Sequence, residues 1–288
     1  TTSNVFVTWN TVGSNSISVN FTNTNGCPAT SPTTYPVTVK PLPTPAITGS
    51  GTVCQGASMT YTTQSGNTGY AWSVSSGATI TGGGGSGDDF MTLTWTTPGT
   101  HTVNVNYTDG NGCTAVAPAS FPVVVNPLPD VLFNYVTPSI CSGGNTNIQL
   151  ASSVSGTTFS WTATGSSGNV SPQTASGIGN ITQAFSNTGT DIENVIFTVT
   201  PSASGCSPAG TFTSNPIPIY PVPDLTATPS TLTVCPNDQA SIALSSVVQN
   251  VTYFWTATGG AGITPATVSG TGSIAQAFQN SGVTPATV

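Results

Sequence analysis

The stretch that decides the fold lies between Thr44 and Pro129. Along it stand VCQG at 53–56, YAWSV at 70–74, MTLTW at 91–95, NGC at 111–113 and the joint PLP at 127–129. Trp72 follows Cys54 by 18 residues, and Cys113 comes late in the stretch. An early cysteine, a tryptophan in a following strand and a late second cysteine are typical of a two-sheet β-sandwich.

The pattern within the stretch is that of strands and turns. Val103, Val105 and Tyr107 alternate with Asn104 and Asn106, and this period of two places apolar side chains inward and polar ones toward water. Glycine-rich residues 81–87 and DGNG at 109–112 predict turns. No stretch shows a helical period. We therefore predict an all-β chain of immunoglobulin-like sandwich modules.

The rest of the chain repeats this module. Residues 1–43 align without a gap with 87–129, so that Trp9 falls on Trp95 and Cys27 on Cys113. A sister type carries Cys141 with Trp161, and it recurs with Cys235 and Trp255 at the same spacing. The predicted segments are the C-terminal half of a module (1–43), a complete module (44–129), a complete sister module (130–223) and the N-terminal part of another sister module that lacks its last strands (224–288). Pro-x-Pro joints at 41–43, 127–129 and 221–223 favour an extended rod.

Composition excludes several classes of function. Only 3% of the 288 residues are charged, with one lysine (Lys40), no arginine and a net charge of -7. Nucleic-acid binding needs clustered basic side chains, and so does a polybasic membrane patch. No apolar run is long enough to span a bilayer. We expect neither nucleic-acid binding nor direct membrane insertion. Residue 1 is a threonine with no visible signal peptide, which predicts a processed product or an excerpt of a longer protein.

Six cysteines lie far apart, without a C-x-x-C pair and with a single histidine. This spacing favours disulfides over a zinc site. Disulfides form in oxidising compartments. We expect a secreted protein located outside the cell or on its surface.

The motifs resemble a known family. VCQG, YAWSV, NGC, FSWTATG, TQAFSNTG, TVTPSASGC and the PLP joints are similar to the PKD-like, immunoglobulin-like modules of large Bacteroidota cell-surface proteins, including gliding adhesins. The resemblance covers essentially the whole chain. It implies an extracellular array of β-sandwiches with a structural or adhesive role, and it implies no particular ligand.

The cysteines are predicted to pair within modules. Cys54 is expected to bond Cys113, and Cys141 to bond Cys206, because each pair lies inside one module with a tryptophan between. Cys27 and Cys235 then remain, one in a closing half and one in an opening half. We expect them to form an intersubunit disulfide.

Catalytic and metal sites have weak support. His101 is the only histidine, and no G-x-S-x-G signature accompanies it, so we expect a partly exposed strand residue, no enzyme and no cofactor. Aspartates at turns and joints either bind calcium or only stabilise the turns in which they lie. We favour the second interpretation, because no D-x-D-x-D-G spacing occurs. The calcium candidates are Asp88, Asp89, Asp109, Asp130 and Asp224.

Two sequence features concern sugars: sequons for glycan attachment and tryptophans that could bind carbohydrate. Five N-x-S/T sequons are candidates for glycan attachment: Asn20, Asn106, Asn169, Asn180 and Asn250. The tryptophans are predicted to point inward as core residues, and the alternative is an exposed aromatic platform that binds carbohydrate.

The predicted function is structural: a subunit or segment of a surface fibre. Residues 224–288 leave a sheet edge open, and residues 1–43 carry strands without an opening half, so copies of the chain are expected to assemble head-to-tail by strand complementation. One alternative is an adhesin module that recognises a glycan or another surface. Another is that both broken modules are cuts in a longer array.

Overall fold

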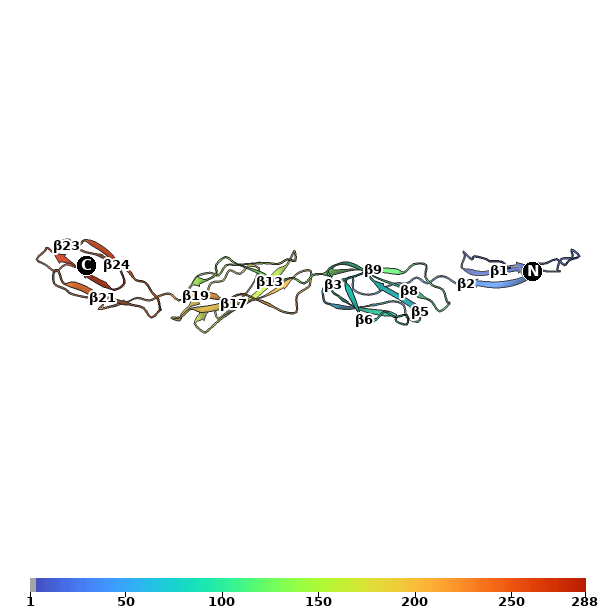
Figure 1. Cartoon of the computed structure of the whole chain (residues 1–288), viewed down its shortest axis with the longest axis horizontal. Coiled ribbons are helices and arrows are strands. Elements are labelled where there is room, and N and C mark those ends of the chain that lie inside the picture. Colours follow the sequence, from blue (N-terminus) through green and yellow to red (C-terminus); the bar gives the residue numbers. More distant parts are fainter. Residues whose placement is uncertain (1–3) are drawn as a thin grey trace. The chain divides into compact units, whose positions relative to one another are not determined.

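The computed structural model describes residues 4–288, and every regular element in this range is a β-strand (Figure 1). Contacts divide the chain between Leu128 and Pro129 into two compact units. Each unit is described by itself. No helix long and apolar enough to cross a membrane is formed by residues 4–288.

The first unit begins with a hairpin. Strand β1 (Gly13–Val19) pairs antiparallel with β2 (Thr33–Val39), with Gly13 opposite Val39. Residues 4–12, which include Trp9, lie outside any strand.

Residues 44–128 form a sandwich of two sheets. One sheet has the order β3-β9-β8-β5 and the other the order β4-β7-β6. Their bounds are β3 (Thr52–Cys54), β4 (Ser58–Thr62), β5 (Thr68–Val74), β6 (Ala78–Gly83), β7 (Phe90–Trp95), β8 (Gly99–Thr108) and β9 (Ala119–Asn126). β3 runs parallel to β9, and β8 lies between β9 and β5.

The core between these sheets is built by the predicted alternation. Val103, Val105 and Tyr107 are buried while the residues between them are half-exposed. Trp95 is fully buried, and its ring meets that of Tyr61 edge-on at 6.2 Å between centroids. The most buried tryptophan is therefore Trp95, whereas Trp72 packs at the margin of the core.

The second unit opens with a complete sister sandwich. Its main sheet has the order β11-β19-β17-β13-β15, with β18 also on β17, and β10-β12 and β14-β16 form the facing pairs. The bounds are β10 (Leu132–Tyr135), β11 (Ile140–Cys141), β12 (Ile148–Ala151), β13 (Thr158–Gly165), β14 (Val170–Ser171), β15 (Thr174–Ile178), β16 (Ser186–Asn187), β17 (Glu193–Ser202), β18 (Phe212–Thr213) and β19 (Ile217–Tyr220). Trp161, Phe185 and Phe197 pack edge-to-face at its centre.

The last segment forms smaller sheets, β20-β21-β25, β22-β24 and β23-β26. The bounds are β20 (Thr226–Thr228), β21 (Gln239–Ser245), β22 (Phe254–Thr258), β23 (Ile263–Thr264), β24 (Thr267–Thr271), β25 (Ile274–Ala277) and β26 (Gln279–Asn280). Within residues 224–288 no strand corresponds to β17, β19 or β11 of the complete sister module.

Candidate functional site: open strands and module ends

The last segment presents an open sheet edge at β22. In the complete module, β13 is paired on both sides, with β15 and with β17. Its counterpart β22 pairs with β24, and the strands of residues 4–288 offer it no second neighbour. The backbone groups along that edge have no ladder partner, and such an edge can accept another strand.

The core of the last segment is correspondingly half-covered. Ile148 and Ile181 are buried in the complete module, whereas their counterparts Ile242 and Ile274 are only half-buried. Trp161 is buried, and Trp255 at the equivalent position is half-buried. The same side chains thus remain partly uncovered where the additional strands are missing.

The β1–β2 hairpin exposes apolar side chains whose counterparts in the complete module are buried. By the repeat, β1 corresponds to β8 and β2 to β9. Val105 and Tyr107 of β8 are 0% and 4% exposed, but their counterparts Val19 and Phe21 are 58% and 68% exposed. The hairpin therefore carries core side chains without a core to cover them.

The opening cysteines lie at one end of their modules. Cys54 is the last residue of β3 and stands opposite Asn126, the last residue before the joint at 127–129. Cys141 stands opposite Tyr220 in the same way, directly before Pro221. We call this end, where the chain leaves the module, the outgoing end.

The closing cysteines lie at the opposite end. Cys113 ends a turn in which its N–H donates to Asp109 Oδ1 at 3.0 Å, and Gly112 adopts a left-handed φ of 81°. Cys206 closes a turn on Ala203, just beyond the end of β17. At this same end the incoming residues are anchored, for example Asp130 on Ser152. We call it the incoming end.

The two expected intramodule disulfides are not formed. Cys54 and Cys206 are each disulfide-bonded, but Cys113 and Cys141 carry free thiols, so neither predicted pair exists. The reason is strand length: Thr108, beside the turn that holds Cys113, lies nine positions along β8 from Gly99, which is near the level of Cys54. At about 3.3 Å per residue this is about 30 Å, whereas bridged Cα atoms lie within about 7 Å.

The sister module repeats this separation. Ser202, before the turn of Cys206, lies nine positions along β17 from Glu193, which is near the level of Cys141. Cys27 and Cys235 are free and exposed in this chain. Their expected bond between copies stays a prediction.

The joint aspartates anchor their own modules. Asp130 Oδ1 accepts hydrogen bonds from Ser152 Oγ at 2.6 Å and from Ser153 N at 2.7 Å. Asp224 is bonded in the same way by Ser246 Oγ and Val247 N. These hydrogen bonds, the serine hydroxyl first, hold the pKa of both carboxyls below the usual value of 3.8.

The carboxylates of two further calcium candidates, Asp109 and Asp88, accept hydrogen bonds within turns. Asp109 accepts from Cys113 N, Asn111 N and Asn111 Nδ2, and the hydrogen bond from Cys113 contributes most to its lowered pKa. Asp88 Oδ2 accepts from Gly85 N at 2.8 Å, and Asp89 is linked by its carbonyl to Thr63 N. Across residues 4–288 no three Asp, Glu, His or Cys side chains gather in a way that could hold a metal ion.

His101 is a packing residue. It is buried rather than partly exposed, it lies against Trp95 at 5.3 Å between ring centroids, and its Nε2 is 2.9 Å from the Thr97 carbonyl. Its Nδ1 faces Ser75 Oγ at 3.4 Å. Both ring nitrogens are thus occupied by structural contacts.

Two of the five sequon side chains are already engaged through the amide nitrogen that a glycan would occupy. Asn106 Nδ2 donates to the Ala115 carbonyl, and Asn169 Nδ2 donates to Glu193. Asn180 accepts from Leu150 N through its oxygen, and Asn20 accepts from Phe21 N. Asn250 adopts a left-handed φ of 60°.

Two clusters of polar side chains were not predicted from the sequence. Glu193 accepts from Ser166, Ser167 and Asn169, and these hydrogen bonds lower its pKa. The buried Asn187 donates to the carbonyls of Asp191 and Ile219 and thereby ties β16 to β19. The repeat of Asn187 at Asn280, within the shared pattern at 181–189 and 274–282, was the available signal for the second cluster.

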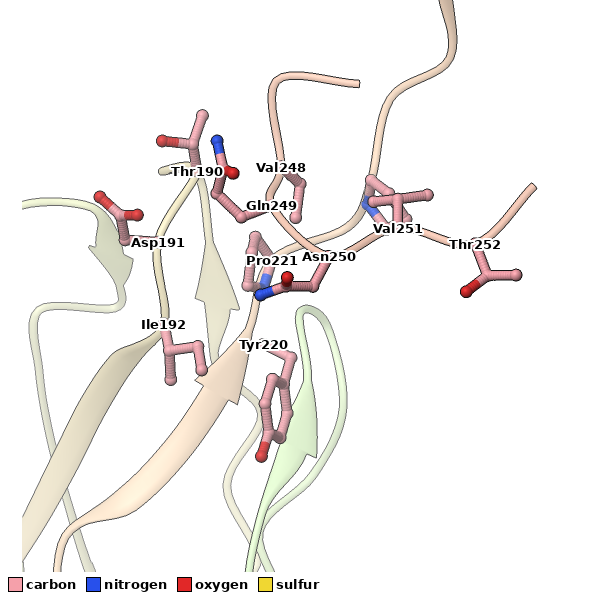
Figure 2. A pocket seen from close by; sticks show the side chains of 11 residues that line it. Thr190, Asp191, Ile192, Tyr220, Pro221, Val248, Gln249, Asn250, Val251 and Thr252 are labelled. Carbon is pink, nitrogen blue, oxygen red and sulfur yellow. The ribbon is translucent and has the colours of Figure 1, made fainter. Parts of the chain in front are cut away.

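The second unit contains a cavity of about 650 Å³ (Figure 2). Its lining combines the ring of Tyr220 with the polar side chains of Asp191, Gln249 and Asn250. Tyr220 is the last residue of β19, and the two amides belong to the loop after β21.

Two segments match the PKD-like domain family, residues 40–123 and residues 138–221. No curated protein matches the chain. Solved structures similar in fold include a marsupial T cell receptor (9% identity, TM-score 0.36, covering 80% of this chain and 92% of that one). Another is FdeC, an Escherichia coli adhesin (15% identity, TM-score 0.30, covering 83% and 92%). A third is the protocadherin gamma B4 extracellular domain (11% identity, TM-score 0.33, covering 95% and 52%). At these scores the likeness carries no argument about function.

Proposed function

Since this chain belongs to the PKD-like domain family, through two segments that together exceed half of its length, we propose that it is a structural building block of an extracellular fibre. PKD-like domains are generally non-catalytic, and the disulfide-bonded Cys54 and Cys206 are consistent with an oxidising location outside the cell. Copies of the chain are the proposed partners.

The observation that carries the proposal is the half-covered core of residues 224–288. The sister module shows what complete coverage looks like, since there β17 lies between β13 and β19. The open edge at β22 offers backbone pairing, and the partly exposed Trp255 and Ile242 offer apolar surface. A strand that fills this place gains both ladder hydrogen bonds and apolar burial.

The occupant we propose is the β1–β2 hairpin of another copy. β1 corresponds to β8, which is the central strand of its sheet as β17 is of the sister sheet. Val19 and Phe21 supply the apolar side chains that a second core would bury. Each copy then receives a hairpin at one end and donates one at the other. Such heterologous contact generates an open filament.

Assembly of the 288-residue chain tests this proposal. Sedimentation and negative-stain microscopy should detect concentration-dependent filaments. Val19→Asp, which places a charge on the side of β1 predicted to be buried, should abolish them. Ser16→Asp, at an exposed position on the alternating face of the same strand, is the matched control and should assemble. A native chain that stays monomeric at every concentration would contradict assembly between copies. It would favour the alternative that both incomplete modules are cuts in a longer array.

The cavity beside Tyr220 supports a second candidate function, glycan recognition. An aromatic ring together with a carboxylate and two amides is a lining that can stack on a sugar and bond its hydroxyls. Tyr220→Ala should abolish binding on a glycan array, and Val222→Ala, at an exposed neighbour outside the lining, should leave it intact. No binding by the native chain would rule this candidate out.

A further inference from the structure

Within residues 4–288, one amide hydrogen of Asn280 has no acceptor. In the complete sister module, Asn187 Nδ2 donates to a carbonyl of its own turn at 2.7 Å and to the Ile219 carbonyl of β19 at 2.9 Å. Its counterpart Asn280 donates only to the Thr284 carbonyl, at 2.9 Å, because no strand of the last segment takes the place of β19. A side-chain amide carries two N–H donors, so one of them remains for an incoming carbonyl.

Apart from this contact, the two asparagine turns are alike. Asn187 Oδ1 accepts from Gly189 N, and Asn280 Oδ1 accepts from Gly282 N, both at 2.9 Å. The side chain of Asn280 is thus already held by the turn contacts that Asn187 makes in the complete module. Asn187 is 5% exposed, whereas Asn280 is half-buried. The difference in burial therefore reflects the missing strand and not a different turn.

The opening residues of the last segment lack the same neighbour. In the sister module, Ile140 and Cys141 form β11 by pairing in parallel with β19. Their counterparts Val234 and Cys235 form no strand. Val234 is 39% exposed, whereas Ile140 is 7% exposed. A strand in the place of β19 would therefore contact both these opening residues and Asn280.

We infer, as an extension that rests on the proposed function, that Asn280 sets the register of the donated hairpin: its remaining amide hydrogen binds the Val39 carbonyl of β2 in another copy. Val39 corresponds to Ile219, because each stands two positions before a Pro-x-Pro joint. The pairing within the hairpin agrees, since Val39 stands opposite Gly13, the first residue of β1, as Ile219 stands opposite the first residue of β17. Sequence and strand pairing thus assign the same acceptor.

This register reproduces the order of the complete sheet. In the sister module the order is β11-β19-β17-β13-β15. Residues 234–235 followed by β2, β1, β22 and β24 give the same order, and the β1–β2 pairing already exists in each chain. Val19 then stands opposite Trp255, as its counterpart stands opposite the tryptophan of β13. Val37 and Val39 take the positions of two isoleucines of β19 that are 1% and 0% exposed.

A proline makes the amide of Asn280 more important for the register. In the sister module, Ser142 N donates to the Tyr220 carbonyl at 2.8 Å. The counterpart of Ser142 is Pro236, which has no N–H to donate. Asn280 is therefore the side chain that reads the position of β2 at this end. A slip of β2 by one residue would turn its apolar side chains to the opposite face of the sheet.

The same register revises the Cys27–Cys235 bond expected from the sequence. Cys235 stands opposite Lys40, as Cys141 stands opposite Tyr220 in the sister module. Cys27 lies in the turn closed by Thr22, which is nine positions along the hairpin from the first residue of β1. That separation is about 30 Å, whereas bridged Cα atoms lie within about 7 Å. A Cys27–Cys235 link in native filaments would therefore overturn the register.

Asn280→Asp tests the role of the amide in the full chain. The variant keeps Oδ1 for Gly282 N, but it replaces the N–H donors with a carboxylate oxygen that repels the Val39 carbonyl. It should raise the concentration needed for filaments by about tenfold or more, the effect of an unmade buried hydrogen bond. Gln279→Glu, which adds the same charge at the exposed neighbouring position, is the matched control and should assemble as the native chain does.

Mixing two variants separates a defect in docking from general misfolding. Val19→Asp chains keep an intact acceptor, and Asn280→Asp chains keep an intact hairpin. Each should remain monomeric alone, and the equimolar mixture should form dimers in analytical ultracentrifugation. A mixture without dimers, in conditions where the native chain forms filaments, would contradict the assigned roles.

Cysteine trapping measures the register itself, which a merely structural role of Asn280 would not define. Paired strands lie about 4.8 Å apart, so Lys40→Cys in filaments of the Cys27→Ser chain should bond Cys235. Oxidised glutathione takes up the two electrons and two protons and is reduced to two thiols. Thr38→Cys, two positions along β2 and more than about 7 Å from Cys235, is the control and should give no such bond. Peptide mapping without reduction identifies the link.

The outcomes separate the two levels of the proposal. A native chain that never assembles would overturn both the proposed function and the role of Asn280. Native filaments that Asn280→Asp leaves unchanged would overturn only the role of Asn280. A bond to Cys235 from Thr38→Cys instead of Lys40→Cys would show that β2 docks in another register.

Discussion

At the scale of single residues, the aspartate that follows each joint fixes the start of a sandwich. Asp130 and Asp224 occupy equivalent repeat positions, and each bonds a serine hydroxyl and the following backbone N–H. A sequence rule that associates Pro-Asp with turns finds these residues but not their partners, which lie 22 residues further along the chain.

Asp130 should make the stability of its module depend on acid pH. Its folded pKa is below 3.8, so its stabilising effect is complete above that value and is lost as the pH falls below it through the folded pKa. Asp130→Asn should flatten this acid decline. Ser152→Ala, which removes the donor that lowers the pKa most, should flatten it as well. Amide exchange in β12 and β13 between pH 5 and pH 2.5 measures the effect, and wild-type slopes in both variants would contradict it.

Gly177 is required by the ring of Trp161. A Cβ added to Gly177 would collide with the indole, because the ring lies directly over this residue of β15. Gly177→Ala should destabilise the module by about 1–3 kcal/mol through overpacking. Gly168→Ala, where no atom lies within 4 Å of the new methyl group, is the control. Urea unfolding of the two variants compares them, and equal midpoints would contradict the packing.

At the scale of elements, the alternation of apolar and polar residues predicted the strands well. β8 follows the predicted pattern from His101 to Tyr107, with every second side chain buried. The repeat also located the counterpart of β13 correctly, at β22. Neighbours of a strand could not be predicted in this way, because pairing depends on residues that are distant in sequence.

Amide exchange should distinguish β22 from β13. The strands carry the same WTATG sequence, but β13 is paired on both sides and β22 on one. In the monomer, amides of β22 that point to the open edge should exchange at least tenfold faster than their counterparts in β13. Filament formation should remove the difference. Equal protection in the monomer would show that another segment already covers the edge.

At the scale of the whole molecule, neither complete sandwich is held together by a disulfide between its own opening and closing cysteines. Each core is closed by its own strands, and no bond joins the opening and closing cysteines of one module. Removing an intramodule disulfide from a small domain typically costs about 2–5 kcal/mol. Reduction of this chain should instead leave both complete modules folded.

Thermal unfolding with and without reductant measures this. The far-UV circular dichroism spectrum should be unchanged on reduction, and the unfolding midpoints of both complete modules should shift by less than about 3 °C. A fall of the size expected from losing an intramodule staple, about 10 °C or more for a domain of this length, would contradict the assignment.

The sequence by itself determined the all-β class, the repeat and the core faces, because a period of two and a recurring spacing are properties of the chain read in order. Only the tertiary structure decided which cysteines could meet. Cys54 and Cys113 belong to one module in sequence, but the ten-residue strand β8 places them at opposite ends of it. Disulfide bonding depends on distance in space, and that distance is set by strand register and direction, which no spacing along the chain encodes.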